Sequence, residues 1–338
     1  MRAYQLPKRG AGIDGLVQVE RPDPQPAYRQ VLVKVGACSL NFRDLLIANG
    51  NFDPPVRDNF IPLSDGAGEI VAAGPGVTRV KVGDRVAGCL FQRWSGGEAP
   101  ADSHAAALGG GIDGMLAEYA VLEEEGVVKL PPHLSLEEGA TLPCAGVAVW
   151  NAMVEHARLK AGQTVLLQGT GGVSIFGLQF ARAMGIRTII TSSSDEKLAR
   201  AKALGANHGI NYRTTPDWDN AAMTITEGRG VDHVVEVGGA ETLVRSFGAV
   251  RIGGSISVIG VLSGYKAELN TGLFLARRAN VQGISGGSTQ TFATMARAIA
   301  VHAIKPVIDR IFAFAEAPAA YRYLASGTHF GKVVIRVA

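Results

Sequence analysis

The stretch that decides the fold is Gln163-Thr-Val-Leu-Leu-Gln168 followed by Gly169-Thr170-Gly171-Gly172-Val173-Ser174. Its first half is an apolar run typical of a buried strand, and its second half is a glycine-rich turn. Apolar residues then recur at helical spacing as far as Met184, and Gly185 ends the predicted helix. A strand, a glycine turn and a helix in this order predict the start of a parallel sheet.

The residues that follow continue the same alternation. We predict a strand over Ile186–Thr191, then a helix over Asp195–Leu204 with Ser194 as its N-cap. Three further strands are predicted, and they span His208–Tyr212, Asp232–Val237 and Ser255–Val261. Strands that alternate with helices predict an α/β fold with a doubly wound parallel sheet, a Rossmann domain over residues 146–288.

The chain before this domain has a β-rich pattern. Short apolar runs at Gln30–Val35, Gly68–Ala73 and Arg85–Cys89 alternate with Gly and Pro, as in a small barrel. Residues 92–114 are rich in Gly, Ala and Ser, and we predict a surface loop there. The last fifty residues return to a mixed pattern and are expected to fold back onto the first domain. The predicted domains are therefore 1–145 with 289–338, and 146–288.

Composition excludes several classes of protein. The chain has 338 residues, a formal net charge of +3 and no block of Lys and Arg, so neither nucleic acid nor a membrane surface is expected as a partner. No run of residues is long and apolar enough for a membrane span. Three cysteines give no disulfide framework, and the N-terminus has no apolar signal core. We therefore expect a cytoplasmic protein.

The glycine turn predicts a site for a dinucleotide. Gly169, Gly171 and Gly172 let backbone N–H groups approach a pyrophosphate at the positive end of the following helix, and Thr170, Val173 and Ser174 complete the loop. The sixth position of the fingerprint is Ser174 in place of Gly, and we expect its hydroxyl to be able to add a hydrogen bond to phosphate.

The end of the second predicted strand favours NADP(H) over NAD(H). An NAD site places an acid there to bind the ribose 2′-OH, whereas this strand ends in Ser192, Ser193 and Ser194, with Lys197 just beyond and Tyr212 after the third strand. Hydroxyls and a cation suit a 2′-phosphate. The alternative interpretation is a polar loop followed by a solvated helix face.

The chain resembles the medium-chain dehydrogenase/reductase family, with its quinone oxidoreductase and alcohol-dehydrogenase-like branches. The motifs that carry the resemblance are Ser39-Leu-Asn41-Phe-Arg-Asp44, Pro62-Leu-Ser-Asp65-Gly-Ala-Gly68, Val82-Gly-Asp-Arg-Val86, Leu142-Pro-Cys144-Ala-Gly146, the Gly169–Ser174 loop and Gly331-Lys-Val-Val-Ile335.

The resemblance implies a GroES-like catalytic domain interrupted by the Rossmann domain, with the active site in the cleft between them. It also implies that Lys197 and Tyr212, fifteen residues apart, bind the 2′-phosphate, and that two chains form a homodimer by joining their Rossmann sheets near Ser255–Val261.

Zinc-bearing members of this family hold a catalytic metal at three positions, two of which this sequence fills differently. Asn41 stands at the first ligand position and Ser64 at the second, where the family has Cys and His. Cys144 alone matches a ligand, and Asp65 matches a neighbouring acid of the motif. Zinc needs three ligands from thiolate, imidazole and carboxylate, so we predict no zinc.

Without a Lewis acid, acceptors that spread negative charge themselves become favoured. We therefore predict hydride transfer from NADPH to a small-molecule quinone or α,β-unsaturated carbonyl, with Asn41 orienting the nicotinamide ribose or the substrate carbonyl, and with Arg43, Ser64 and Asp65 lining the site. Asp44 is expected to cap the adjoining helix. Two alternatives stay open, an alcohol dehydrogenase with an unusual metal site and a catalytically silent NADPH-binding protein.

Overall fold

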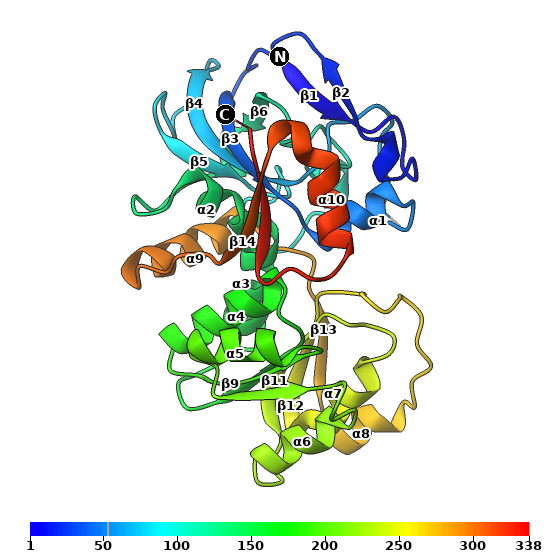
Figure 1. The fold of residues 1–338 in the computed structure, drawn as a ribbon. Helices are drawn as coiled ribbons and strands as arrows, with labels where there is room; N and C mark the ends of the chain where they lie inside the picture. Colours follow the sequence, from blue (N-terminus) through cyan, green and yellow to red (C-terminus); the bar gives the residue numbers. More distant parts are fainter. Residues whose placement is uncertain (53, 338) are drawn as a thin grey trace. The chain divides into compact units, whose positions relative to one another are not determined.

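The computed structural model describes residues 1–52 and 54–337, so Ala338, the last residue of the predicted catalytic domain, lies outside the described residues. The chain forms two compact units (Figure 1). The first unit comprises Met1–Val147 and the C-terminal stretch from Gly286, and the second comprises Ala148–Ser285. None of the helices in the described part of the chain is long and apolar enough to cross a bilayer.

The second unit is built on a parallel sheet of six strands in the order β10-β9-β8-β11-β12-β13. This is the doubly wound order of a Rossmann domain, in which the strand order reverses beside the first strand. The strands span β8 Thr164–Leu167, β9 Arg187–Ser192, β10 His208–Asn211, β11 Val231–Glu236, β12 Val250–Val258 and β13 Asn280–Gly283. The predicted Rossmann fold is confirmed.

Helices cover both faces of this sheet, with α4 and α5 on one face and α6, α7 and α8 on the other (Figure 1). They span α4 Gly172–Ala183, α5 Asp195–Ala203, α6 Trp218–Ile225, α7 Leu243–Ala249 and α8 Gly272–Arg277. Ser194 caps α5 as predicted, because its hydroxyl accepts a hydrogen bond from the N–H of Lys197. The helix α3, Val147–Trp150, lies at the boundary between the units in the sequence.

Two features of this unit differ from the sequence prediction. The strand β13 was not predicted, because Asn-Val-Gln-Gly offers little apolar pattern, yet it pairs in parallel with β12. It is the edge strand of the described sheet, whereas β12 lies inside the sheet between β11 and β13. The prediction that sheets join near Ser255–Val261 is therefore wrong, because the backbone groups of an internal strand are already paired.

The first unit contains a mixed sheet in the order β14-β15-β3-β4-β5-β7, with β6 also paired to β3, and a separate hairpin of β1 and β2. The strands span β1 Arg2–Gln5, β2 Val17–Glu20, β3 Gln30–Ser39, β4 Asp65–Ala73, β5 Arg85–Gly88, β6 Tyr119–Glu123, β7 Val127–Lys129, β14 Ile308–Ala313 and β15 Lys332–Arg336. The helices are α1 Phe42–Ala48, α2 Leu136–Ala140, α9 Thr289–Val301 and α10 Ala317–Ala325. The predicted β-rich domain is confirmed.

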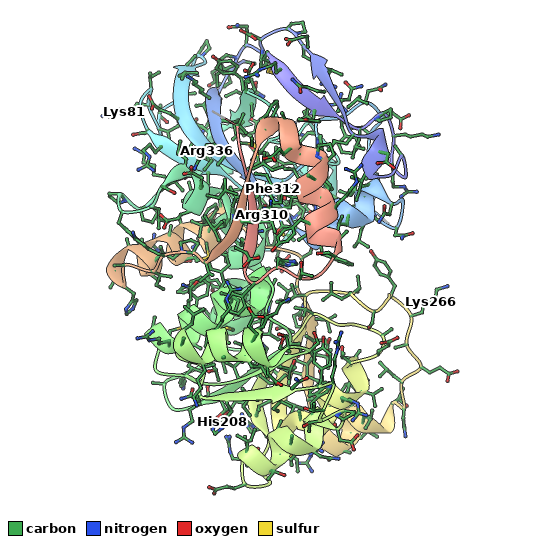
Figure 2. All side chains as sticks on the ribbon, in the orientation of Figure 1. Lys81, His208, Lys266, Arg310, Phe312 and Arg336 are labelled. Atoms are coloured by element: carbon green, nitrogen blue, oxygen red, sulfur yellow. The ribbon has the colours of Figure 1, made fainter. Side chains whose placement is uncertain are left out.

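The C-terminal strands complete this sheet as expected. Lys332–Arg336 pairs antiparallel with the end of β3, which joins residues almost 300 positions apart in the chain. On the neighbouring strand β14 the Arg310 guanidinium lies 4.6 Å from the ring centroid of Phe312 (Figure 2).

The segment predicted as a surface loop, residues 92–114, is exposed only in part. Its second half turns inward, and residues 106–110 are all buried. Leu108 is fully buried and belongs to the main hydrophobic core of this unit. The prediction of a surface loop is therefore wrong for these residues, because their small side chains let the backbone pack inside the domain.

Candidate functional site

Three residues that the sequence assigned to the site, together with Cys144, lie in three segments of the first unit. Asn41 precedes α1, Ser64 and Asp65 lie at the start of β4, and Cys144 lies in a π-helical turn over Leu142–Gly146. The structure brings them together, because the N–H of Cys144 donates to Asp65 Oδ2 at 3.3 Å and the hydroxyl of Ser64 donates to Asp65 Oδ1 at 2.8 Å. Asn41, Ser64 and Asp65 are all buried.

A fifth residue, Lys332, completes this cluster and was not predicted as part of it. Its ammonium group donates to Asn41 Oδ1 at 2.6 Å and to the carbonyl oxygen of Leu40 at 2.8 Å. It also lies 3.7 Å from Asp65 Oδ2, with both side chains buried. Lys332 opens β15, and the pairing of β15 with β3 places it beside Asn41, so only long-range topology reveals the contact.

Burial raises the pKa of Asp65, and the nearby Lys332 ammonium, the Asn41 side chain and the Ser64 hydroxyl act in the opposite direction. Burial and the neighbouring Asp65 raise the pKa of the Cys144 thiol to about 12. Cys144 is therefore a neutral thiol near pH 7. Its side chain packs against an apolar cluster of Leu90, Phe91, Ala107 and Trp94, which agrees with its interpretation as a small apolar residue.

Arg43 is held beside this cluster on the first turn of α1. Its Nη1 donates to the carbonyl oxygen of Leu108 at 3.2 Å and lies 3.5 Å from Asp44 Oδ1, while its guanidinium carbon is 5.3 Å from the ring centroid of Phe52. The carboxylate of Asp44 accepts the N–H of Asn41 at 2.7 Å, so the predicted helix cap is confirmed. Burial raises the pKa of Asp44 to about 6, although the Arg43 charge opposes the shift.

The glycine turn of the second unit has the geometry that a pyrophosphate site needs. Gly169 adopts φ 71°, and nothing lies within 4 Å of a Cβ added there, so the left-handed backbone itself requires glycine. Gly171 precedes α4, whose first N–H groups have no partner within the helix. Gly171, Gly172 and Val173 are half-exposed, whereas Thr170 and Ser174 are buried.

The hydroxyl of Ser174 has a different partner from the one expected. It donates to the carbonyl oxygen of Gln168 at 2.5 Å and so closes the turn. Its proton is therefore not free to bond to a phosphate. The close packing that the fingerprint usually obtains from its third glycine comes one turn later, at Gly177. A Cβ at Gly177 would lie 2.8 Å from Leu167 Cδ2, which shows how closely α4 approaches β8.

The residues predicted to hold a 2′-phosphate lie at the ends of β9 and β10. Ser192 ends β9 and is buried, Ser193 and Lys197 are half-buried, and Tyr212 is exposed and donates its N–H to the carbonyl oxygen of Ser192 at 3.0 Å. The first carboxylate after β9 in the chain, Asp195, opens α5 and accepts a hydrogen bond from Asn211 Nδ2 at 2.8 Å. No acid therefore ends β9 itself.

A buried carboxylate, Glu236, ties the two central loops of this unit together, and sequence reasoning missed it. Its Oε2 accepts from Gln168 Nε2 at 2.7 Å and from the Ser246 hydroxyl at 2.5 Å. Its Oε1 accepts from the N–H groups of Gly238 and Gly239 and from the Thr242 hydroxyl. Gln168 precedes the glycine turn, so this network joins that turn to the loop after β11.

Two family models match the chain over these same regions. A model described as an alcohol dehydrogenase GroES-like domain matches residues 27–132, and one described as a zinc-binding dehydrogenase matches residues 172–301. The chain belongs to the medium-chain dehydrogenase/reductase family.

Relatives within this family carry two kinds of description. A zinc-type alcohol dehydrogenase-like protein of Schizosaccharomyces pombe is 43% identical over 97% of this chain and 96% of its own length. A chloroplastic quinone oxidoreductase of Triphysaria versicolor is 29% identical over 99% of this chain and 98% of its own length. The crystal structure of a putative alcohol dehydrogenase from Sinorhizobium meliloti is 42% identical, with a TM-score of 0.90 over 99% of this chain and 98% of that one.

A medium-chain dehydrogenase/reductase can carry zinc, but the side chains at the family's metal positions differ here from those of a zinc site. Those positions offer the Asn41 amide, the Ser64 hydroxyl and the Cys144 thiol. The neighbouring Asp65 carboxylate already accepts hydrogen bonds and faces an ammonium group. Within residues 1–52 and 54–337, no three His, Cys, Asp or Glu side chains gather as metal ligands. This donor set does not fit zinc.

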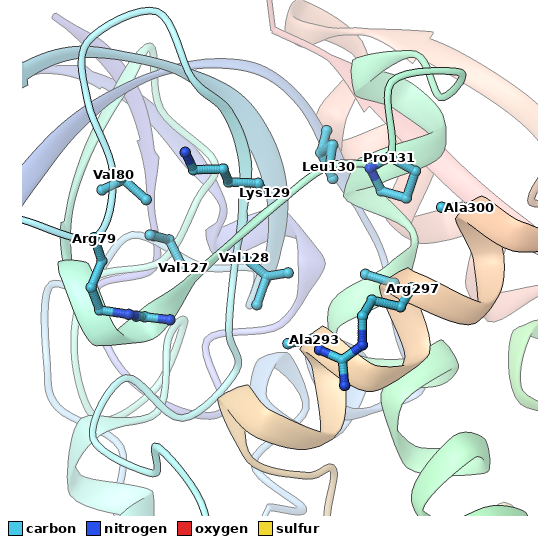
Figure 3. A pocket seen from close by; sticks show the side chains of 11 residues that line it. Arg79, Val80, Val127, Val128, Lys129, Leu130, Pro131, Ala293, Arg297 and Ala300 are labelled. Carbon is cyan, nitrogen blue, oxygen red and sulfur yellow. The ribbon is translucent and has the colours of Figure 1, made fainter.

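A surface pocket of about 380 Å³ lies elsewhere in the first unit (Figure 3). Val80, Val128, Leu130 and other apolar side chains form its floor, and the basic side chains of Arg79, Lys129 and Arg297 surround it. Lys129 is paired with Asp84 at 2.8 Å and Arg79 with Glu125 at 3.1 Å. None of the candidate site residues lines this pocket.

Proposed function

We propose that this protein is an NADPH-dependent oxidoreductase that reduces a quinone or an α,β-unsaturated carbonyl compound without zinc. The observation that carries the proposal is the buried cluster at the family's metal positions, where an amide, a hydroxyl and an ion pair between Lys332 and Asp65 replace metal ligands. A conjugated acceptor delocalises the charge that hydride addition creates, so it needs less stabilisation than a saturated aldehyde.

The reduced dinucleotide, when bound, supplies the hydride. The half-exposed turn Gly171–Val173 at the start of α4 would bind its pyrophosphate through backbone N–H groups, with Gly169 permitting the turn. On the first unit, Asn41 would orient the acceptor through a hydrogen bond. Arg43, fixed by Leu108 and Phe52, would add positive potential beside the site. Ser64 and Asp65 would hold the Lys332 ammonium group that contacts Asn41.

The preference for NADP(H) over NAD(H) rests on the end of β9. Ser192, Ser193 and Ser194 offer hydroxyl groups, and Lys197 offers a cation for a 2′-phosphate. Asp195 is bound by Asn211 at the start of α5, where a first-turn acid is favoured by the helix dipole. Tyr212, exposed at the end of β10, is the second residue that we assign to the phosphate.

The test measures oxidation of NADPH and NADH with a panel of quinones and enones, using protein purified in a chelator and checked by elemental analysis. We expect turnover with NADPH that added zinc does not increase. Turnover of a secondary alcohol only after zinc is added would instead support an alcohol dehydrogenase, which the S. pombe and S. meliloti relatives favour. Tight NADPH binding without turnover on any acceptor would identify a silent binding protein.

We further propose a cytoplasmic homodimer. The unpaired edge of β13 is the part of the described Rossmann sheet that a second copy could extend.

A further inference from the structure

The buried amide of Asn41 has one satisfied end and one unsatisfied end. Its Oδ1 accepts a hydrogen bond from Lys332, whereas its Nδ2 forms no hydrogen bond with any atom of the described residues and is buried. Nδ2 faces the Asp65 carboxylate closely enough for the Asn41 side chain to lower the pKa of Asp65, but the contact does not reach hydrogen-bond geometry. A buried N–H without a partner is destabilising, so natural proteins keep one only for a reason such as ligand binding.

Contact with Lys332 determines which end of the Asn41 amide is the oxygen and which is the nitrogen. An ammonium group has three donors and no acceptor, so the amide atom that faces it must be the oxygen. Rotation of the amide by 180° would place two N–H donors against the ammonium group. The contact between Nζ and Oδ1 at 2.6 Å therefore fixes Asn41 as a donor toward everything else in the site.

The position of Lys332 is itself fixed. Its side chain is 4% exposed, and its ammonium group is held by the Leu40 carbonyl oxygen and by the carboxylate of Asp65. The Ser64 hydroxyl and the Cys144 N–H hold that carboxylate in turn. Every partner comes from the backbone or from a buried side chain. The lysine cannot turn away from Asn41 without leaving its charge buried and unpaired.

We propose that Asn41 donates its Nδ2–H to the oxygen of the acceptor as negative charge develops there, and that Lys332 is the positioning residue that enforces this orientation. The inference rests on the proposed function and deepens it. An oxyanion accepts hydrogen bonds only, so it needs a group locked as a donor. A ribose hydroxyl both donates and accepts, and would bind either end of the amide equally well. The fixed orientation of Asn41 therefore favours the acceptor oxygen over the nicotinamide ribose as the partner of Nδ2.

The first test replaces the donor while keeping the shape. Asn41→Asp is isosteric, keeps an oxygen against Lys332 and turns the Nδ2–H donor into an acceptor. We expect kcat/KM for an enone or quinone to fall at least about 100-fold, mainly through kcat, while the affinity for NADPH stays within about twofold. Retained activity, or a loss confined to NADPH binding, would overturn the proposal, the latter because the donor would then face the cofactor.

The second test asks whether Lys332 acts through Asn41. Lys332→Met and Asn41→Ala are each expected to lower kcat/KM at least about 100-fold, and the double variant should be no more than about threefold worse than the poorer single one. Factors that multiply would mean that Lys332 acts on its own and would refute the positioning role. Lys81→Met, which removes an exposed lysine of the same unit, is the control and should leave all constants unchanged (Figure 2).

Loss of Lys332 alone leaves the buried Asp65 without its cation, so the fold is checked separately. Thermal unfolding of each variant is followed by circular dichroism. If Lys332→Met is unfolded, the double variant Lys332→Met/Asp65→Asn, which removes both charges, is used in its place. This double variant is expected to show the same loss in kcat. Full activity in a folded double variant would refute the role of the lysine.

A binding experiment separates this inference from the proposed function. The probe is 4-nitrophenol, whose colour reports whether it binds as phenol or phenolate, titrated into the complex with NADP+. We expect wild-type protein to bind the phenolate, and Asn41→Asp and Lys332→Met to bind it at least about tenfold more weakly. Phenolate binding with this pattern but no turnover would overturn only the function. Turnover by the wild type with equal phenolate binding by all variants would overturn only the inference.

Discussion

The buried carboxylate of Glu236 gives the sharpest test of how the second unit is held together. Substituting Glu236→Gln keeps the size of the side chain and turns one of its two oxygens into an NH2 donor. Five donors surround these oxygens, three at Oε1 and two at Oε2. The NH2 group will therefore choose the Oε2 side, where the Ser246 hydroxyl can rotate and accept from it.

Gln168 cannot adjust in the same way. Its Nε2 donates to Glu236 and to the Ser246 hydroxyl oxygen, and its Oε1 already accepts from the N–H groups of Val237 and Gly238, so turning the amide would lose these bonds. The variant therefore loses the hydrogen bond from Gln168 Nε2 and the negative charge that strengthens the other bonds, which together cost about 3 kcal/mol. For a unit of 138 residues, from 148 to 285, this free energy corresponds to a fall in Tm of roughly 10 °C.

Differential scanning calorimetry and urea unfolding measure this loss, and intrinsic fluorescence measures NADPH binding. We expect NADPH affinity to fall about tenfold, because the Gln168 bond also anchors the turn that begins at Gly169. Glu241→Gln, an exposed acid of the same loop, is the matched control. A Tm for Glu236→Gln within about 2 °C of this control would refute the reasoning.

Three further outcomes are expected. Ser193→Asp places a carboxylate at the end of β9. In steady-state assays it should lower the ratio of kcat/KM for NADPH to kcat/KM for NADH at least about tenfold. An unchanged ratio would contradict the assignment of the 2′-phosphate to this strand end. Burial lowers the pKa of His233 to about 4, so the unfolded chain takes up its proton first as the pH falls. Urea unfolding should therefore show about 2 kcal/mol of stability lost between pH 7.5 and pH 5 that His233→Gln does not lose. Gly177→Val should cost about 1–3 kcal/mol, measured the same way, because its side chain would collide with Leu167; partial recovery with Leu167→Ala would identify the collision as the cause.

Local sequence pattern predicted the elements whose signals are local. The run that ends at Gln168, the turn at Gly169, the helix after it and the cap at Ser194 all depend on residues within one or two turns of each other, and the structure has them. The strand β13 has no such signal, because an edge strand of Asn-Val-Gln-Gly is recognised only through its pairing with β12.

The candidate site was predicted in part for the same reason. Asn41, Ser64 and Asp65 were assigned to the site because they stand at motif positions, and the structure brings them together around Lys332. The buried course of residues 106–110, which supplies the carbonyl oxygen that holds Arg43, was not found. Small residues are equally common in exposed turns and in tightly packed backbone, so composition alone does not separate the two.

The two residues that sequence reasoning missed, Lys332 and Glu236, share a physical feature that explains why. Each is a charged group that is almost fully buried, and such groups occur in stable proteins only when several partners compensate for the loss of water. These partners come from distant parts of the chain: Lys332 bonds to Asn41, 291 positions away, and Glu236 bonds to Gln168, 68 positions away. A charge in the sequence ordinarily indicates the surface. A charged residue inside a buried strand departs from that expectation. When such a residue also lies beside a candidate site, it is the first candidate for a residue that orients the reacting groups.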